Sequence, residues 1–241
     1  MVSAADPVER ATGRLVHLPD APFLLGELSP VHALARVVAG PVVVDNDVNW
    51  AARAERSAAA PGELDDFAYL YLGEGLGCAV VADGQVRRGH RGLAGEIAHL
   101  LARGPQGRAV HFTEVFAELG LREPQSTAID VAALLQVVGG DGAQPRRVRA
   151  VLAEATGGVL AALVALADPQ LVVIGGSWGT CPAFVEALTE QLTRLPRRLP
   201  VRAAQATNEP SLSGARQQAT QDLQAAVLAQ PHTRNPDPES T

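Results

Sequence analysis

Residues 69–99 read YLYLGEGLGCAVVADGQVRRGHRGLAGEIAH, and this stretch decides how the chain is interpreted. The aromatic and aliphatic run FAYLYL at 67–72 predicts a β-strand. Gly73, Gly75 and Gly77 alternate at its end, where glycines let a turn approach a ligand and expose backbone N–H groups. The pattern predicts a ligand-binding strand end, although a glycine-rich hairpin without a ligand would look the same.

Strands and helices alternate along the rest of the chain, and the Asp83-Gly84 pair predicts an antiparallel hairpin among them. Further strands are expected at 41–44, 78–82, 85–88, 171–174 and 201–206. Helices are expected at 28–38, 48–60, 111–119, 129–138, 146–167, 182–195 and 214–229. This alternation predicts an α/β fold with a mixed sheet.

Composition excludes several classes of protein. The net charge is −6 and the 20 basic residues are all arginine, which disfavours direct nucleic-acid binding. Cys78 and Cys181 are far apart, so they predict no disulfide framework and fit a reducing cytoplasm. The N-terminus has no secretory signal, and the apolar run at 151–167 is too short and interrupted for a membrane span. A cytoplasmic globular protein without membrane contact is expected.

Glu96 and His99 lie three residues apart, so a helical segment would place them on one face. A carboxylate accepts hydrogen bonds and an imidazole donates or accepts them, which suits a ligand with several hydroxyl groups. The alternative is a surface glutamate beside a structural histidine. Asn46 or Asp47 stands where the N-cap of the helix expected at 48–60 belongs.

Four segments in chain order resemble the ROK family of sugar kinases and sugar-responsive repressors. They are DPVERATGRLVHLPDAP at 6–22, VVVDNDVNWAARAE at 42–55, the stretch at 71–100 ending in GEIAHL, and DPQLVVIGG at 168–176. The resemblance implies an actin-like, ribonuclease-H-like α/β fold of two lobes. An incomplete first lobe is expected over 1–107, a second over 108–229, and a disordered tail over 230–241.

The same resemblance implies roles for individual residues. The sugar ligands would be Asn46, Asp47, Glu96, His99 and Glu114, and helix capping is the alternative for the first two. In a kinase, Asp47 would be the general base toward the attacking hydroxyl. The nucleotide-type turns would be formed by Gly73, Gly75, Gly77, Gly175 and Gly176.

The sequence departs from the family in three respects. The segment at 100–116 lacks the family's zinc cysteines, and His99 with His111 cannot complete a tetrahedral site, so no zinc and no other bound metal is predicted. Glu74 replaces a small hydroxyl residue of the kinases, and its charge would repel nucleotide phosphates. Neither the kinases' Asp-x-Gly-x-Thr turn nor the repressors' winged helix is found, so an uncovered strand edge is expected within 67–81.

These departures favour a sensing module of a ROK transcriptional regulator, which binds a sugar or sugar phosphate without turnover and needs no cofactor. On this interpretation the chain is not an enzyme. The alternative is an ATP-dependent sugar kinase, for which the resemblance implies ATP and Mg²⁺. It also implies a homo-oligomer.

Overall fold

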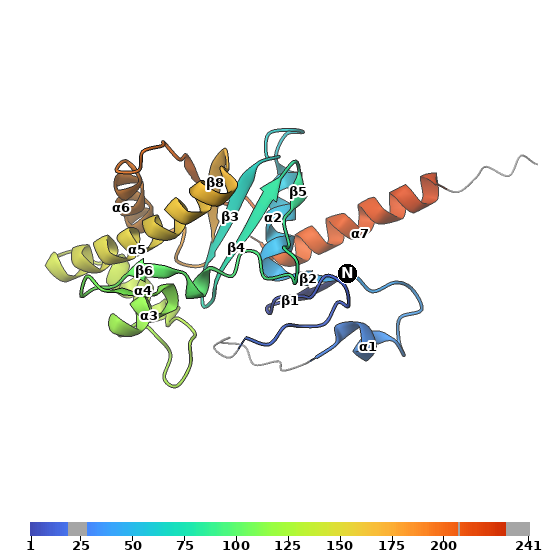
Figure 1. The fold of residues 1–241 in the computed structure, drawn as a ribbon, viewed down its shortest axis with the longest axis horizontal. Coiled ribbons are helices and arrows are strands. Elements are labelled where there is room, and N and C mark those ends of the chain that lie inside the picture. The colour runs from blue at the N-terminus through green and yellow to red at the C-terminus, as the bar shows by residue number, and fades with distance from the viewer. Residues whose placement is uncertain (19–27, 207, 230–241) are drawn as a thin grey trace, which may run out of the picture.

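The computed structural model describes residues 1–18, 28–206 and 208–229, and its centre is a five-stranded mixed sheet (Figure 1). The spatial order is β5 (Gln85–Val86), β4 (Leu76–Ala82), β3 (Phe67–Leu72), β8 (Leu171–Gly175) and β9 (Val201–Ala203). Strand β3 pairs antiparallel with β4 and parallel with β8, which confirms the mixed α/β sheet.

Alternate residues of β3 face two different hydrophobic layers, as the two-residue period of a strand requires. Ala68, Leu70 and Leu72 belong to the larger core beneath helices α3 to α6. Phe67 and Tyr69 face the opposite side and pack against helix α2. A strand covered on both faces reads as a continuous apolar run, and FAYLYL at 67–72 has this pattern.

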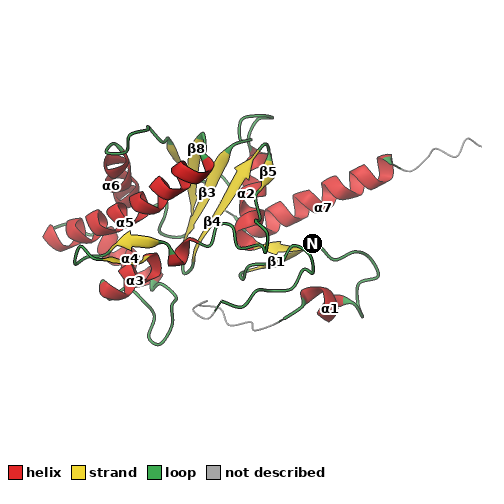
Figure 2. Ribbon diagram, viewed as in Figure 1, coloured by secondary structure: helices red, strands yellow, loops and turns green. Residues whose placement is uncertain are grey.

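Helices lie on both sides of this sheet, and α1 lies apart from it (Figure 2). Their bounds are α1 (Pro30–Leu34), α2 (Asp47–Ala58), α3 (Phe112–Glu118), α4 (Val131–Val138), α5 (Ala143–Ala167), α6 (Pro182–Leu192) and α7 (Pro210–Leu228). Helix α5 is long and apolar enough to cross a membrane by length and composition. Its residues Leu152, Val159 and Leu160 are buried in the larger core, and core helices of water-soluble proteins pass the same test.

Strands β1, β6 and β7 escaped the sequence interpretation, and the strand expected at 41–44 lies at 44–46 as β2. Strand β1 (Val2–Ala4) pairs in parallel with β2 (Val44–Asn46), and the indole Nε1 of Trp50 donates to the Val2 carbonyl at 2.9 Å. Strands β6 (Leu101–Arg103) and β7 (Ala109–His111) form a hairpin after the 3₁₀ helix η1 (Ile97–His99). Three-residue strands carry too little alternation to be recognised in sequence.

The expected uncovered edge within 67–81 is wrong, because β3 lies between β4 and β8, and β4 is itself paired with β5. The sheet combines strands from before and after residue 107. A lobe boundary at 107 would therefore cut one sheet, and this division stays a prediction. The expected disorder at 230–241 lies outside the described residues.

Helix α7 returns from the end of the chain to pack along α2, and it projects beyond the sheet at its far end (Figure 1). The two helices are in close contact at Gly214, whose Cα faces the backbone of Trp50. A methyl group added at Gly214 would overlap the Trp50 carbonyl oxygen. Glycine is therefore required by this contact between α2 and α7.

Gly214→Ala is expected to lower the free energy of unfolding by about 1–3 kcal/mol, the usual cost of overpacking. Gly158→Ala in α5 is the matched control, because no heavy atom lies within 4 Å of the added methyl group. The control is expected to be neutral or to stabilise by roughly 0.5–1 kcal/mol, since alanine favours a helix interior. Urea denaturation of both variants measures this, and equal effects would contradict the close α2–α7 contact.

Candidate functional site

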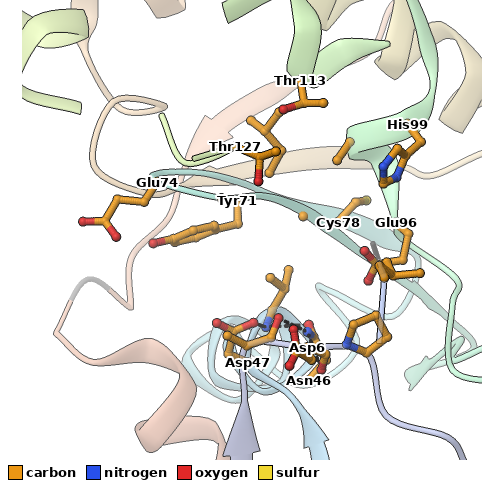
Figure 3. A pocket seen from close by; sticks show the side chains of 18 of the residues that line it. Asp6, Asn46, Asp47, Tyr71, Glu74, Cys78, Glu96, His99, Thr113 and Thr127 are labelled. Carbon is orange, nitrogen blue, oxygen red and sulfur yellow. Dashed lines mark hydrogen bonds between the residues drawn. The ribbon is translucent and has the colours of Figure 1, made fainter. Parts of the chain in front are cut away.

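A pocket opens where the ends of β1 and β2, the start of α2, the glycine turn after β3 and helix η1 meet (Figure 3). Its cavity measures about 200 Å³, which is room for a small ligand. The polar side chains among its lining residues are Asp6, Asn46, Asp47, Tyr71, Glu74, Glu96, His99, Thr113 and Thr127. Four of the five sugar ligands expected from sequence are thus brought together.

Asn46 holds the floor of the pocket in place. Its Oδ1 accepts from the Val48 N–H at 2.9 Å, which makes it the N-cap of α2. Its Nδ2 lies 3.3 Å from each of the carbonyl oxygens of Ala5 and Asp6 and donates to them. Both the capping role and a place in the pocket are therefore observed for Asn46, whose side chain ties the loop after β1 to α2.

Asp47 is the first residue of α2, and its Oδ1 also accepts from the Val48 N–H, at 2.8 Å. Glu96 precedes η1 without capping it through its side chain, and it lines the pocket opposite Asp47. His99 ends η1 on the same side as Glu96 (Figure 3). The ligand space thus lies between a helix N-terminus and a Glu–His pair.

Burial changes the acidity of these carboxyl groups. Burial, followed by the negative charges of Asp47 and Asp6, raises the pKa of Glu96 to about 7. Burial and the charge of Asp6 also raise the pKa of Asp47 to about 6, although the Val48 N–H counteracts this. At neutral pH Asp47 is mostly ionised, whereas Glu96 both donates and accepts hydrogen bonds.

These raised pKa values make stability depend on pH. Between about pH 4.5 and 7 the folded protein keeps a proton on Glu96 that the unfolded chain releases, so stability falls as pH rises. This fall in the free energy of unfolding is on the order of 2 kcal/mol, and Glu96→Gln is expected to abolish it. Urea denaturation at several pH values measures it, with the exposed Glu123→Gln as control. An unchanged slope in Glu96→Gln would contradict the buried, protonated carboxyl.

Asp45 anchors the pocket from behind. Its carboxylate is 2% exposed and accepts from the Asn46 N–H at 2.9 Å and from Asn49 Nδ2 at 2.8 Å. Arg53 Nη1 lies 2.7 Å from Oδ2, and Arg88 Nε lies 3.3 Å from Oδ1. Because Arg88 precedes the glycine loop that leads to the Glu–His pair, Asp45 connects both walls of the pocket.

Asp45→Asn is expected to lower the free energy of unfolding by about 3 kcal/mol, because two arginines lose their buried partner. Asp65→Asn is the matched control, since the Arg56–Asp65 pair is exposed on both sides. Exposed ion pairs contribute about 0–1 kcal/mol, so the control should change little. Equal losses in the two variants, measured by urea denaturation, would contradict the anchoring role of Asp45.

Sequence reasoning missed Asp6, Tyr71, Thr113 and Thr127, all of which line the pocket. Asp6 follows β1 just as Asp47 follows β2, and the carboxyl ends of parallel strands meet at one edge. Recognising β1 as a strand would therefore have pointed to Asp6. Tyr71 lies on β3 beside the glycine turn. It is two residues after the buried Tyr69 and so shares its face of the strand, which was the available signal in the sequence.

The remaining predicted site residues are Glu114 and the glycines, and only some of the glycines line this pocket. Glu114 is exposed, and its Oε2 accepts from the His111 N–H at 3.0 Å at the start of α3, so it caps a helix instead of facing the ligand space. Gly75 and Gly77 line the pocket, but Gly73 does not. Gly175 and Gly176 pack closely against Tyr69 and Leu72 of β3.

His99 and His111, which were not expected to complete a zinc site, lie close together. The ring centroids of His99 and His111 are 5.7 Å apart in an edge-on arrangement. Within residues 1–18, 28–206 and 208–229 no group of three or more His, Cys, Asp or Glu side chains is arranged to hold a metal ion. The absence of zinc from the protein stays a prediction.

The fold and pocket define an α/β protein with a polar pocket at the ends of parallel strands. The chain belongs to the ROK family, whose family model matches residues 8–222. Family membership and the actin-like fold predicted from sequence are thereby confirmed.

Kinases are prominent among its relatives. The chain is 29% identical over 195 residues to the N-acetylmannosamine kinase of Salmonella typhi, covering 77% of this chain and 67% of that protein. It is 30% identical over 162 residues to the bifunctional enzyme NanE/NanK of Brucella melitensis, covering 66% of this chain. It spans only 31% of that bifunctional enzyme's length.

Solved structures of other ROK proteins have a similar fold. The ROK hexokinase of Thermus thermophilus superposes with a TM-score of 0.69 at 26% identity, covering 92% of this chain and 78% of the hexokinase. A ROK transcriptional regulator homologous to the Escherichia coli MLC protein superposes with a TM-score of 0.62 at 21% identity, covering 89% and 61%. At that identity the regulator shares the fold alone.

The expectation of a non-enzymatic regulator module is contradicted by these kinase relatives. The position of Glu74 in the structure weakens its expected effect on nucleotide phosphates. Its side chain is exposed and points away from Asp47 (Figure 3). Water screens a charge at such a position, so its repulsion of phosphate is weaker than the sequence suggested.

Proposed function

We propose that this chain belongs to a sugar kinase that transfers the γ-phosphoryl group of ATP to a hydroxyl group of a hexose or amino sugar. The observation that carries the proposal is Asp47, a half-buried carboxylate at the pocket floor with a raised pKa of about 6. The similarity to N-acetylmannosamine kinase and ROK hexokinase supports the same reaction class.

Asp47 acts as the general base in this proposal. Its Oδ1 is held by the Val48 N–H, which leaves Oδ2 to accept the proton of the sugar hydroxyl. As that proton moves to Asp47, the sugar oxygen bonds to the γ-phosphorus, the bond from the γ-phosphorus to the bridging oxygen breaks, and ADP leaves. A base with a pKa of about 6 is ionised at neutral pH yet still basic enough to assist.

The opposite wall orients the sugar. Glu96 and His99 offer both donors and acceptors, so neighbouring hydroxyls find partners after losing water. Asn46 contributes mainly by position, because its Nδ2 already donates to backbone carbonyls. Glu114 is not assigned a sugar contact, because it caps α3.

The pocket accepts the phosphates of ATP with Mg²⁺ on one side. Gly75 and Gly77 line it next to Asp47 without bulky side chains, and the exposed carboxylate of Glu74 at the same turn would be a donor of the kind that Mg²⁺ prefers. Magnesium-bound ATP supplies the phosphoryl group and neutralises charge that develops during transfer. Gly175 and Gly176 remain candidates for contacts with the rest of the nucleotide.

The remaining features of the proposed enzyme follow from family resemblance. A cytoplasmic location and a homo-oligomer are part of the proposal, and no direct nucleic-acid contact is included. The division into a lobe over 1–107 and a lobe over 108–229 is modified, because the five-stranded sheet includes strands from both ranges. A boundary following β2 fits the strand order better.

Asp47→Asn is expected to lower turnover by about 10²–10⁴-fold, because the amide cannot accept the hydroxyl proton. Sugar binding should persist, since asparagine still accepts and donates hydrogen bonds. ADP release with a panel of hexoses and amino sugars measures turnover, and isothermal titration measures binding. Asp222→Asn, exposed on α7, is the control with unchanged turnover.

Two results would refute the kinase proposal. One is full turnover by Asp47→Asn, which would remove the base from the mechanism. The other is a correctly folded wild-type chain that releases no ADP with any sugar of the panel, although it binds one of them.

A further inference from the structure

The pocket is strongly acidic, and this has a consequence for the ligand. Four carboxyl groups line it, those of Asp6, Asp47, Glu74 and Glu96, whereas no arginine does within the described part of the chain. Lysine does not occur in the sequence. The nearby Arg53 and Arg88 are held behind the pocket by Asp45.

The proposed phosphoryl-transfer mechanism gives no role to the carboxyl group of Asp6. It is 4% exposed and lies just after β1, beside Asn46 and Asp47 (Figure 3). Asn46 donates to its backbone carbonyl at 3.3 Å, so the residue is held in position. Among the residues the structure describes, no hydrogen bond or ion pair to its side-chain carboxylate is observed.

A carboxylate that lies largely out of water and has no ion-pair partner is stabilised when a cation approaches it. Burial accordingly raises the pKa of Asp6, and His17, which is exposed, offsets this only in part. Asp6 also raises the pKa of both Asp47 and Glu96, so its charge acts on the ligand space. A cation supplied by the ligand would relieve all three groups together.

We infer that the preferred sugar carries a free amino group, and that its ammonium pairs with Asp6 while Asp47 receives the proton of the reacting hydroxyl. This inference rests on the proposed function and narrows its substrate class. An N-acetylated sugar is neutral and leaves Asp6 without a counter-charge. A sugar phosphate brings further negative charge among these carboxyl groups and is disfavoured.

The test compares matched sugars at neutral pH. Glucosamine, N-acetylglucosamine and glucose form one series, and mannosamine, N-acetylmannosamine and mannose form the second. Isothermal titration and ADP release with magnesium-bound ATP are measured for each. In at least one series the amine should bind about tenfold more tightly than its neutral relatives, the gain typical of a charge-assisted hydrogen bond.

Variants assign that preference to one residue. Asp6→Asn should reduce the preference for the amine over the parent hexose by about tenfold, because the amide lacks the charge. Asp141→Asn, which is exposed before α5, is the control and should keep the wild-type preference. Circular dichroism of Asp6→Asn verifies that it is folded, and Asp6→Glu should retain part of the preference if the charge is decisive.

The possible outcomes distinguish a failure of this inference from a failure of the proposed kinase function. If a hexose or N-acetylated sugar is bound and phosphorylated at least as well as the amine, the inference is overturned and the kinase proposal stands. If Mg²⁺ alone binds and Asp6→Asn abolishes that binding without any amine preference, Asp6 is a metal ligand and the inference also fails. If the folded protein binds no sugar, both proposals fall together.

Discussion

The carboxylate of Asp45 is the point on which the pocket's geometry depends. It is the middle residue of β2, is almost completely buried, and gathers the Asn46 backbone N–H, Asn49, Arg53 and Arg88 around two oxygens. A buried charge is stable only when it is paired and hydrogen-bonded, and here the partners come from two separate parts of the chain, residues 46–53 and Arg88. The base-bearing helix and the loop that leads to Glu96 are therefore held by one group.

Asp45 also determines the electrostatics of the pocket. By engaging Arg53 and Arg88 on its own side, it withholds their charges from the ligand side, where Asp47 and Glu96 are left with raised pKa values. A general base needs a pKa close to the working pH, and partial burial beside other carboxyl groups supplies it. The position of Asp47 and its raised pKa are thus consequences of the same arrangement of charges.

Much of this arrangement was predictable from sequence, where local patterns are strong. The strand at 67–72, the hairpin at Asp83-Gly84 and the meeting of Asp47 with Glu96 and His99 were all anticipated. Asp6 was missed because β1 has three residues and pairs with residues some forty positions away. Glu114 was assigned to the sugar because a capping glutamate and a ligand glutamate look identical in sequence. The charge of Glu74 was one of the reasons for the rejected regulator interpretation, and the exposure of that side chain is a tertiary property that sequence does not contain.

The packing of α7 on α2 has a consequence for how the protein is made. Helix α2 carries Asp47 at its start and is held on one side by strands from the beginning of the chain and on another by the final helix. During synthesis on the ribosome the strands that precede α7 emerge before it, so nascent α2 lacks its packing partner until α7 has been made. Contacts between such distant segments form slowly, because a large loop must close first. The pocket is therefore expected to mature only once α7 has emerged, and until then the face of α2 that receives Gly214 is open to chaperones.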